Sequence, residues 1–595
     1  MVLTDFERGI LGEISKERLW KDVMWFADKG EKLSGTQVNE KSVDYILESL
    51  QAYQVPANAP VFQAWLGFPK LFEAELKVLE PVQRALDCLT LAQCASATVE
   101  GELVYVGGGG EEEYKNVNAR NKIVLVDFSL PPARPWKNYV AGVLKGAVGQ
   151  VVISHKGPKR AINRGTVKSV WGNPLPENIN DIGRIPVVNI TREDGEYLIK
   201  LLEKGPVRIR LKAEGQRGFY RTRQPMAKVE GKVKHFVLLG SHMDAWGAAA
   251  TCNALGCAST LEAARSMKKN QSKLRRGLEM LWFQGHETGI MTGSTWYLDT
   301  FWDNLNKNCV AYLNNDTTNM IHSNIYTVDG DPVIRDFLIS TVRELAEEEG
   351  AAFKEPNSKY RAYKYGDQSF LGIGIPSVRV QTTFTSEGRE IVGPGGGWWY
   401  HSEYDTLDKC DPETMYMVEK AQTLVIIRLC TLPVLPYRVE RLVDWTLDAL
   451  KELEEIAGDT FSLSDLIDKA AILKQNAYVL DEATVKLAKR CEKTSKSLDG
   501  EVIHVNNCIM KLSRIMNPIN YTLRGKYDQD YYGAEYVKPI PILRPVSELV
   551  NLNPDDIEYK TLRTKLVRAR NKVSDSIDEA IFTVEYALEK LNIPT

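Results

Sequence analysis

A chain of 595 residues is long enough for two to four domains of ordinary size. Hydrophobic residues make up 44% of the chain, charged residues make up 26%, and the formal net charge is −3. This balance is typical of a soluble globular protein and gives no electrostatic reason to expect binding to nucleic acid or to a membrane surface. The sequence holds no run of about 18 apolar residues, so it predicts no membrane-spanning helix.

The first 215 residues change from helical to β-rich patterns. Residues 40–53 (EKSVDYILESLQAY) carry apolar residues three and four positions apart, which predicts an amphipathic helix. Residues 72–81 (FEAELKVLEP) alternate between apolar and polar, as a strand does. From about residue 100, short β-rich pieces such as residues 184–191 (RIPVVNIT) stand between glycines and prolines. We therefore expect a separate β-rich domain over residues 101–215.

Residues 230–435 alternate between strands and helices. Strands are predicted at 234–240, 275–283, 309–315 and 375–382, and helices at 254–270, 292–305 and 331–350. This rhythm predicts an α/β fold with a central mixed, mostly parallel sheet flanked by helices. Functional side chains are expected just past the carboxyl ends of such strands. After about residue 435 the apolar residues follow a helical period, so we expect a helical domain over residues 436–595.

The cysteines bear on the compartment of the protein. The chain has nine cysteines without paired spacing, and its N-terminus carries charges where a signal peptide needs an apolar core. An odd number of cysteines in a long chain without an export signal indicates reduced thiols. We therefore expect a cytoplasmic protein.

Four segments place metal-binding types of side chain at the ends of predicted strands. They are LLGSHMDAW with His242 and Asp244, WFQGHETG with His286 and Glu287, YLNNDTT with Asp316, and WWYHSEYDT with Tyr400 and His401. Imidazoles and carboxylates are common zinc ligands, and a His-x-Asp pair can place a carboxylate behind the imidazole. Three of the seven histidines of the chain fall in these segments, so the pattern predicts a metal site.

On these residues the chain resembles the zinc aminopeptidase and glutamate carboxypeptidase superfamily, which also contains the transferrin receptor. The resemblance covers most of the chain and implies a zinc-exopeptidase-like catalytic domain made of residues 1–100 and 216–435. It also implies that residues 101–215 form an inserted protease-associated domain and that residues 436–595 form a helical dimerisation domain. One or two divalent metal ions are implied, with zinc expected first and iron or another transition metal as alternatives.

The family motifs assign roles to individual residues. The resemblance implies metal ligands at His242, Cys252, Glu287, Asp316 and His401, with Asp244 as the acid behind His242. It implies a catalytic role for His286, at the position of the general base, and for Tyr400. It implies substrate contacts for Tyr400 and Arg379. Residues 366–378 (GDQSFLGIGIPSV) resemble a further family motif, S-D-x-x-x-F-x-x-x-G-I-P.

Two positions depart from the family pattern. Residues 251–257 (TCNALGC) place Cys252 where the family has a bridging aspartate, and His286 stands where it has a catalytic glutamate. A Cys252 thiolate could bind or bridge metal ions, whereas a neutral thiol would be only a small buried residue. His286 could move protons, because its ordinary pKa is about 6.5, or it could bind the metal, or it could merely fill space.

These observations predict a metal-dependent, hydrolase-like enzyme that acts on an amide or peptide-like C–N bond through a non-standard, mononuclear site. A pseudoenzyme or binding protein on the same scaffold stays open, as does a shifted reaction such as ring opening or a lyase step that uses His286. We expect a small-molecule or peptide-like substrate and a homodimer formed through the helical domain. No nucleic-acid or membrane partner is expected.

Overall fold

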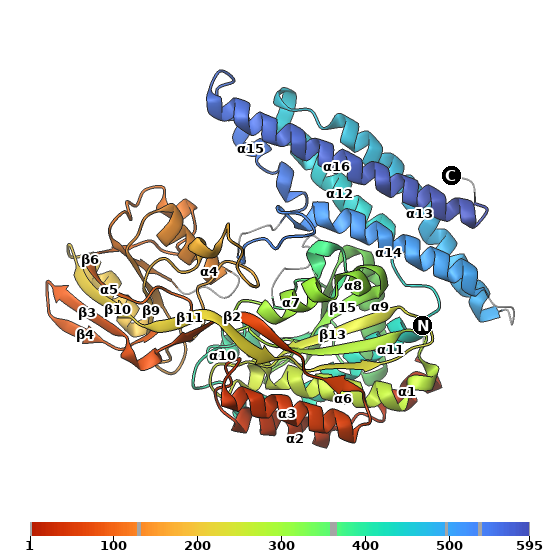
Figure 1. The fold of residues 1–595 in the computed structure, drawn as a ribbon, viewed down its shortest axis with the longest axis horizontal. Coiled ribbons are helices and arrows are strands. Elements are labelled where there is room, and N and C mark those ends of the chain that lie inside the picture. The colour runs from red at the N-terminus through yellow and green to blue at the C-terminus, as the bar shows by residue number, and fades with distance from the viewer. Residues whose placement is uncertain (1–2, 128–132, 357–365, 494–497, 534–537, 594–595) are drawn as a thin grey trace.

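The structure is a computed structural model that describes residues 3–127, 133–356, 366–493, 498–533 and 538–593. Figure 1 shows three regions: a lobe built on one sheet, a central α/β body, and a group of long helices that lies across the body. The α/β fold with a mixed sheet and a C-terminal helical region, predicted from the sequence, is confirmed. In the part of the chain that is described, no helix combines the length and the apolar character needed to cross a membrane.

The body is built on a seven-stranded sheet. Its strands are β1 (Ala57–Asn58), β12 (Met226–Val229), β13 (Phe236–His242), β14 (Gly277–Phe283), β15 (Cys309–Asn314), β16 (Ile325–Gly330) and β17 (Ser377–Thr383). Their spatial order is β1-β12-β14-β13-β15-β17-β16. The four central strands run parallel, whereas β1, β12 and β16 pair antiparallel at the edges. The sheet is therefore mixed, with a parallel centre.

Both faces of the sheet are buried, because the strands are apolar on both sides. In β13, Val237 and Leu239 face one core while Phe236 and Leu238 face another. The first core is covered by α6 (Leu255–Lys269), α9 (Pro332–Glu349) and α11 (Pro412–Thr431), and the second by α7 (Thr292–Thr300) and α8 (Trp302–Asn308). Continuous apolar strands of this kind suit a parallel sheet between two helical layers.

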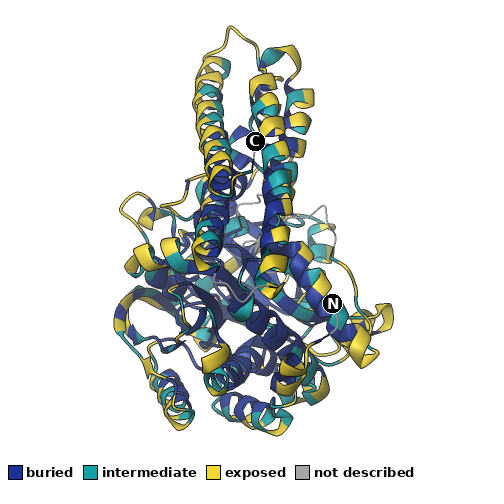
Figure 2. Ribbon diagram, turned by 90° about the vertical axis from the view of Figure 1, so that its right-hand side faces the viewer, coloured by how far each residue is buried: buried dark blue, intermediate teal, exposed yellow. Residues whose placement is uncertain are grey.

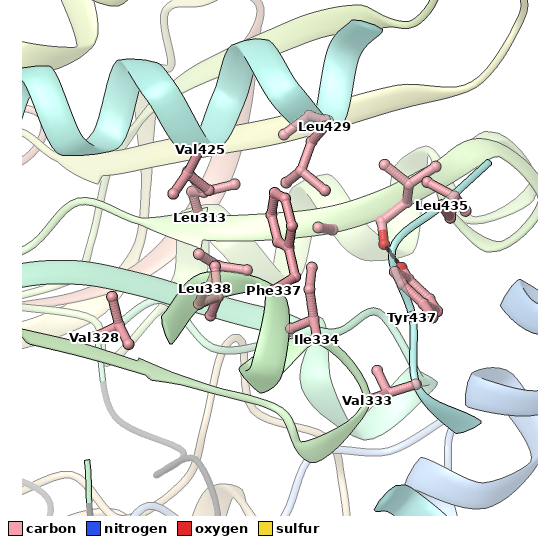
Figure 3. Packing of buried hydrophobic residues seen from close by; sticks show 14 of the residues in the cluster. Leu313, Val328, Val333, Ile334, Phe337, Leu338, Val425, Leu429, Leu435 and Tyr437 are labelled. Carbon is pink, nitrogen blue, oxygen red and sulfur yellow. Dashed lines mark hydrogen bonds between the residues drawn. The ribbon is translucent and has the colours of Figure 1, made fainter. Parts of the chain in front are cut away.

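Helix α9 illustrates how the sequence sets these elements. Asp331 caps its first turn by accepting a hydrogen bond from the Val333 amide at 3.1 Å, and Gly350 ends it in the left-handed conformation. Between these ends, the apolar face of α9 packs against β15, β16 and α11, as Figure 3 shows for Phe337 and Leu338. Nearby, the hydroxyl of Tyr437 donates a hydrogen bond to the carbonyl of Val310.

The lobe contains an eight-stranded sheet with the order β4-β3-β10-β6-β7-β8-β9-β5. These strands are β3 (Glu75–Glu80), β4 (Arg84–Leu86), β5 (Cys88–Thr90), β6 (Ala97–Tyr105), β7 (Ile123–Val126), β8 (Gly149–Ile153), β9 (Val187–Ile190) and β10 (Arg208–Ala213). Residue 101, where we expected this domain to begin, lies inside β6. Residues 75–90 belong to the lobe because β3 and β5 pair with β10 and β9. That the lobe is a protease-associated domain stays a prediction.

A two-stranded ribbon connects the lobe to the body. It pairs β2 (Val61–Pro69) with β11 (Gly215–Arg223) in an antiparallel register from end to end. Its strands lead into and out of the lobe sheet, so the lobe is an insertion between β1 and β12 of the body.

The C-terminal region contains the long helices α12 (Val439–Ala457), α13 (Ser464–Lys493), α14 (Asp499–Tyr521) and α16 (Ile557–Lys590), and the short helix α15 (Val546–Leu549). Their inner faces join the core of the body, while Figure 2 shows exposed residues along their outer faces. Exposed side chains there include Ile472, Tyr478 and Phe582. The homodimer through this region stays a prediction.

We expect Leu338→Ala to lower the unfolding midpoint of the body, because Leu338 is fully buried between α9 and the sheet. Removing such a side chain costs about 2–5 kcal/mol, and tryptophan fluorescence during urea unfolding measures the loss. The matched control is Ile472→Ala on α13, whose side chain is exposed and whose removal should cost less than about 0.5 kcal/mol. Equal losses in the two variants would contradict this packing.

Candidate metal centre

Three neighbouring strands deliver the first residues of the site. Strand β13 lies between β14 and β15 and parallel to both, so the three carboxyl ends meet at one edge of the sheet. His242 is the last residue of β13, His286 and Glu287 follow β14, and Asp316 follows β15. All four side chains are buried, and the structure brings them together.

Cys252 reaches the same place from the turn before α6. Gly256 lies so close to the end of β15 that a Cβ added to it would be 2.3 Å from the carbonyl oxygen of Asn315. The Asn253 side chain holds this contact, because it donates to the Asn315 carbonyl at 2.8 Å and accepts from the Gly256 amide at 3.2 Å. Asp405 fixes the other side of the turn by accepting two hydrogen bonds from Thr251, each of 2.9 Å. Cys252 is thereby held against the strand ends.

His401 enters from a loop that the lobe holds in place. Its φ of 57° lies in the left-handed region, which a histidine adopts only when its surroundings impose it. Two lobe residues do so: the Arg164 amide donates to the carbonyl of His401 at 2.6 Å, and the Asn163 side chain donates to the carbonyl of Tyr400 at 2.6 Å. The lobe therefore helps to position a candidate ligand.

The five candidate ligands form two sets that share Cys252. One set is His242, Cys252 and Asp316, and the other is Cys252, Glu287 and His401. In the first set, His242 Nε2 lies 3.4 Å from Asp316 Oδ1 and 3.7 Å from Cys252 Sγ. Ligand atoms around one tetrahedral zinc ion lie roughly 3.3–3.8 Å apart, given bonds of about 2.0–2.3 Å, so these two distances fit such an ion.

The second set is arranged differently. His401 Nε2 lies 3.7 Å from Cys252 Sγ but only 2.8 Å from Glu287 Oε1. The shorter distance is that of a direct hydrogen bond rather than of two ligands on one ion. The other carboxylate oxygen of Glu287 accepts a hydrogen bond from Trp246 Nε1 at 2.9 Å. Glu287 and His401 therefore form a hydrogen-bonded pair with each other.

The charges of the cluster compensate one another. Burial opposes the ionisation of Glu287, but the adjacent His401 outweighs it and lowers the pKa of that carboxyl to about 2. Asp316 is likewise held well below its usual pKa against burial, because His242 hydrogen-bonds to it. Burial, with Glu287 and Asp316 adding to it, raises the pKa of the Cys252 thiol well above its usual value. The thiol would lose its proton only beside a cation.

His286 has a partner that the sequence-based assignment missed. Its Nδ1 lies 2.9 Å from Oδ2 of Asp367, and its ring stacks on His242 with the ring centroids 3.8 Å apart. Burial opposes the charged imidazole, but Asp367 overrides it and raises the pKa of His286 to about 10. Asp367 belongs to the GDQSF segment, whose likeness to a family motif was the available signal for its role.

The carboxylate of Asp244 bonds to the loop after β14 rather than directly to His242. Its carboxylate oxygen lies 3.9 Å from Nδ1 of His242, and the nearer acceptor for that nitrogen is the backbone carbonyl of Asp244 itself, at 2.9 Å. The carboxylate instead accepts hydrogen bonds from the backbone amides of His286 and Glu287, at 3.2 and 3.0 Å. Asp244 therefore ties the loop after β14 to the end of β13.

Arg379 and Tyr400 lie on one side of the cluster, where they line a hollow in the surface. Arg379 lies in β17, and its Nη2 donates to the carbonyls of Asp316 at 2.7 Å and of Thr317 at 3.1 Å. Tyr400 stacks on His401 with ring centroids 3.8 Å apart. Both residues line a hollow of about 290 Å³ beside the cluster, together with Arg389.

All three regions of the protein line a small cavity at the cluster, of about 70 Å³. The body contributes His286, Glu287 and His401, the lobe contributes Arg134, and the C-terminal region contributes Tyr532. Tyr532 is tied to the lobe, because its amide donates to the carbonyl of Ser169 at 2.6 Å. The site therefore depends on how the three regions pack together.

The sequence and the fold are similar to those of known peptidases. Residues 226–426 match the model of peptidase family M28. The chain is similar to carboxypeptidase Q of Xenopus laevis, at 23% identity over 69% of this chain and 85% of the relative. It is also similar to the probable glutamate carboxypeptidase AMP1 of Arabidopsis thaliana, at 20% identity over 87% of this chain and 81% of the relative. A peptidase M28 precursor of Shewanella amazonensis shares the fold, with a TM-score of 0.56 and 19% identity over 72% of this chain and 97% of that chain.

We expect Asp367→Asn to destabilise the metal-free protein in a pH-dependent way. The pKa of His286 is about 10 in the folded protein and about 6.5 in an unfolded chain, so the His286–Asp367 pair stabilises fully below about pH 6.5 and loses its effect as the pH rises toward 10. Breaking a buried pair of this kind costs about 3–5 kcal/mol at pH 6.

Urea unfolding of the metal-free protein across pH 6 to 10 measures the gap between wild type and variant, which should narrow as the pH rises. Asp575→Asn, an exposed acid on α16, is the control and should leave no such gap. A gap that stays constant or widens with pH would show that Asp367 does not hold His286 in its charged form.

Proposed function

Because this chain belongs to the zinc-peptidase superfamily that contains peptidase family M28, we propose that it is a metal-dependent enzyme that hydrolyses peptide-like amide bonds. The observation that carries the proposal is the cluster of five candidate ligands at the carboxyl ends of β13, β14 and β15. Buried imidazoles and carboxylates so close together are costly unless they pair or bind a cation. A catalytic metal site explains why the fold keeps them.

We propose a single ion, with zinc as the first candidate. His242, Cys252 and Asp316 would hold it, because their ligand atoms have the spacing of a tetrahedral site. Glu287 and His401 bond to each other at 2.8 Å, which supports one ion rather than two. When bound, the ion supplies Lewis-acid polarisation of the substrate carbonyl. A thiolate ligand favours zinc over harder ions.

We propose that His286 transfers the proton that moves from the attacking water to the leaving nitrogen. Asp367 holds its Nδ1, so Nε2 is the nitrogen left for the substrate, at the cavity that His286 lines. His286 is charged in the metal-free protein, and beside a bound cation it would give up that charge. It would then take a proton from the attacking water and pass it to the leaving nitrogen, while Asp367 stabilises the charged ring between the two transfers. This arrangement replaces the carboxylate base of the family with a histidine and an aspartate.

The hollow beside the cluster supports a substrate with a carboxylate. Arg379 and Arg389 both line it, and Tyr400 stands between it and the metal centre. Arginine is suited to planar carboxylates because its donors match them in pairs. A peptide or aminoacyl amide that carries an acidic group next to the cleaved bond therefore fits the site.

A shifted reaction is the second candidate, and the His286–Asp367 pair favours it. An imidazole that is held by a carboxylate can remove a proton from carbon or donate one to a leaving group, as ring opening or a lyase step requires. The same residues would bind the substrate, so product analysis rather than binding separates the two reactions.

We expect one metal ion per chain in elemental analysis of the purified protein. Cys252→Ala should lower the affinity for zinc at least tenfold, because it removes the thiolate that the two ligand sets share. Cys491→Ala, a free cysteine on α13 far from the cluster, is the matched control and should keep the metal. Two ions in the wild type would overturn the single-ion site, and no ion at all would favour a binding protein on the same scaffold.

We expect His286→Gln to lower kcat for glutamyl and aminoacyl amides by about 10²–10⁴-fold while it leaves zinc bound, since it removes proton transfer but no proposed ligand. Hydrolysis is followed by release of the free amine, and zinc is measured on the same samples. A variant that loses its zinc would make His286 a ligand instead. If the wild type cleaves neither class of amide, hydrolysis is excluded for them and the shifted reaction becomes the leading candidate.

A further inference from the structure

A large cleft lies away from the metal centre, between the body and the C-terminal helices. It has a volume of about 850 Å³. The body contributes residues 233–235, which lead into β13, and residues 306–308 at the end of α8. Helices α14 and α16 and the turn 524–527 close the other side. The cleft is therefore near the amino end of β13, whereas the metal centre is at its carboxyl end.

The lining of this cleft is strongly cationic. It contains seven lysines and arginines, namely Lys234, Lys307, Lys511, Arg514, Arg524, Lys526 and Lys572. Its one acidic residue is Glu579. Because the whole chain has a formal net charge of −3, this charge is a local feature and not the consequence of a basic protein.

Few of these cations are neutralised by the protein itself. Lys511 lies 3.2 Å from Glu579 and Lys307 lies 3.3 Å from Asp303, both at exposed positions. Arg514 donates to backbone carbonyls, including that of Asn306 at 3.2 Å. Within the described residues, Lys234, Lys526 and Lys572 form no ion pair with an acid. Like charges that converge from separate segments repel one another, so an anion between them would relieve this cost.

The cleft also has an apolar floor and an aromatic edge. Met510, Ile515 and Ile519 of α14 form buried parts of its floor. At its edge, Tyr527 is 73% exposed, with its ring centroid 5.3 Å from that of Trp302. An exposed ring in this position can stack on a flat organic group. A volume of about 850 Å³ lies within the range of about 300–1,000 Å³ found for small-molecule sites.

From these features we propose that the cleft binds a small, multiply charged phosphate anion, either an inorganic polyphosphate or a nucleoside polyphosphate. The number of uncompensated lysines calls for high negative charge density, which phosphate chains provide. The concave shape and limited volume favour a small molecule over a nucleic-acid strand or a protein partner. Because the ligand would touch both the body and the helical region, its binding would hold the two together.

Isothermal titration of the metal-loaded protein with tripolyphosphate and with ATP, at low and high salt, tests this proposal. The test variant is Lys234→Ala combined with Lys572→Ala, which removes one cation from each side of the cleft. The control combines Lys232→Ala with Lys565→Ala, which lie beside the same two segments and outside the lining. Both variants lose two positive charges, so a general effect of net charge would appear in both.

We expect the test variant to bind both anions at least tenfold more weakly than the wild type, and the control to stay within twofold. Affinity should fall as salt rises, because exposed cations are screened. If ATP binds more tightly than tripolyphosphate and Tyr527→Ala removes the difference, the ligand is a nucleotide, and equal binding indicates an inorganic polyphosphate. Binding that both double variants weaken equally, or that neither weakens, would overturn the cleft as the site.

Discussion

The register of three parallel strands is the constraint on which the candidate metal centre depends. β13, β14 and β15 are buried on both faces, so a shift of one residue would move Leu238 and Leu239 each into the wrong core. Packing therefore determines where each strand ends, and with it where His242, Glu287 and Asp316 stand. Ligand geometry at this edge is a consequence of hydrophobic burial several residues away.

The buried charges explain why the site is a cluster and not a set of separate residues. Each carboxylate among the ligands has an imidazole close to it, Glu287 with His401 and Asp316 with His242. Such pairs recover only part of the cost of burying the charges, and a bound cation would recover more. Cys252 lies between the two pairs as a neutral thiol. Its protonation state therefore changes most when a metal ion binds.

The other regions act on the site through a few hydrogen bonds. The buried amino group of Lys168 in the lobe donates to the carbonyls of Gly172 and Gly289, which joins the lobe to the loop after β14. Trp171 donates to Ser369 of the body at 2.8 Å. The lobe could be predicted from the change in composition near residue 100, but its sheet begins at Glu75. Residues 75–78 alternate between polar and apolar side chains, as a strand of any sheet can, and only the pairing partners of residues 75–90 assign them to the lobe.

The sequence by itself determined the α/β body, the helical C-terminal region and all five candidate ligands, because strand ends and family motifs are local patterns of residues. Asp367 as the partner of His286 and the contribution of Arg134, Asn163 and Tyr532 to the site were decided by the tertiary structure alone. So was the division of the ligands into two sets that share Cys252. These are contacts between segments far apart in the chain, and no local pattern encodes a distance across such a gap.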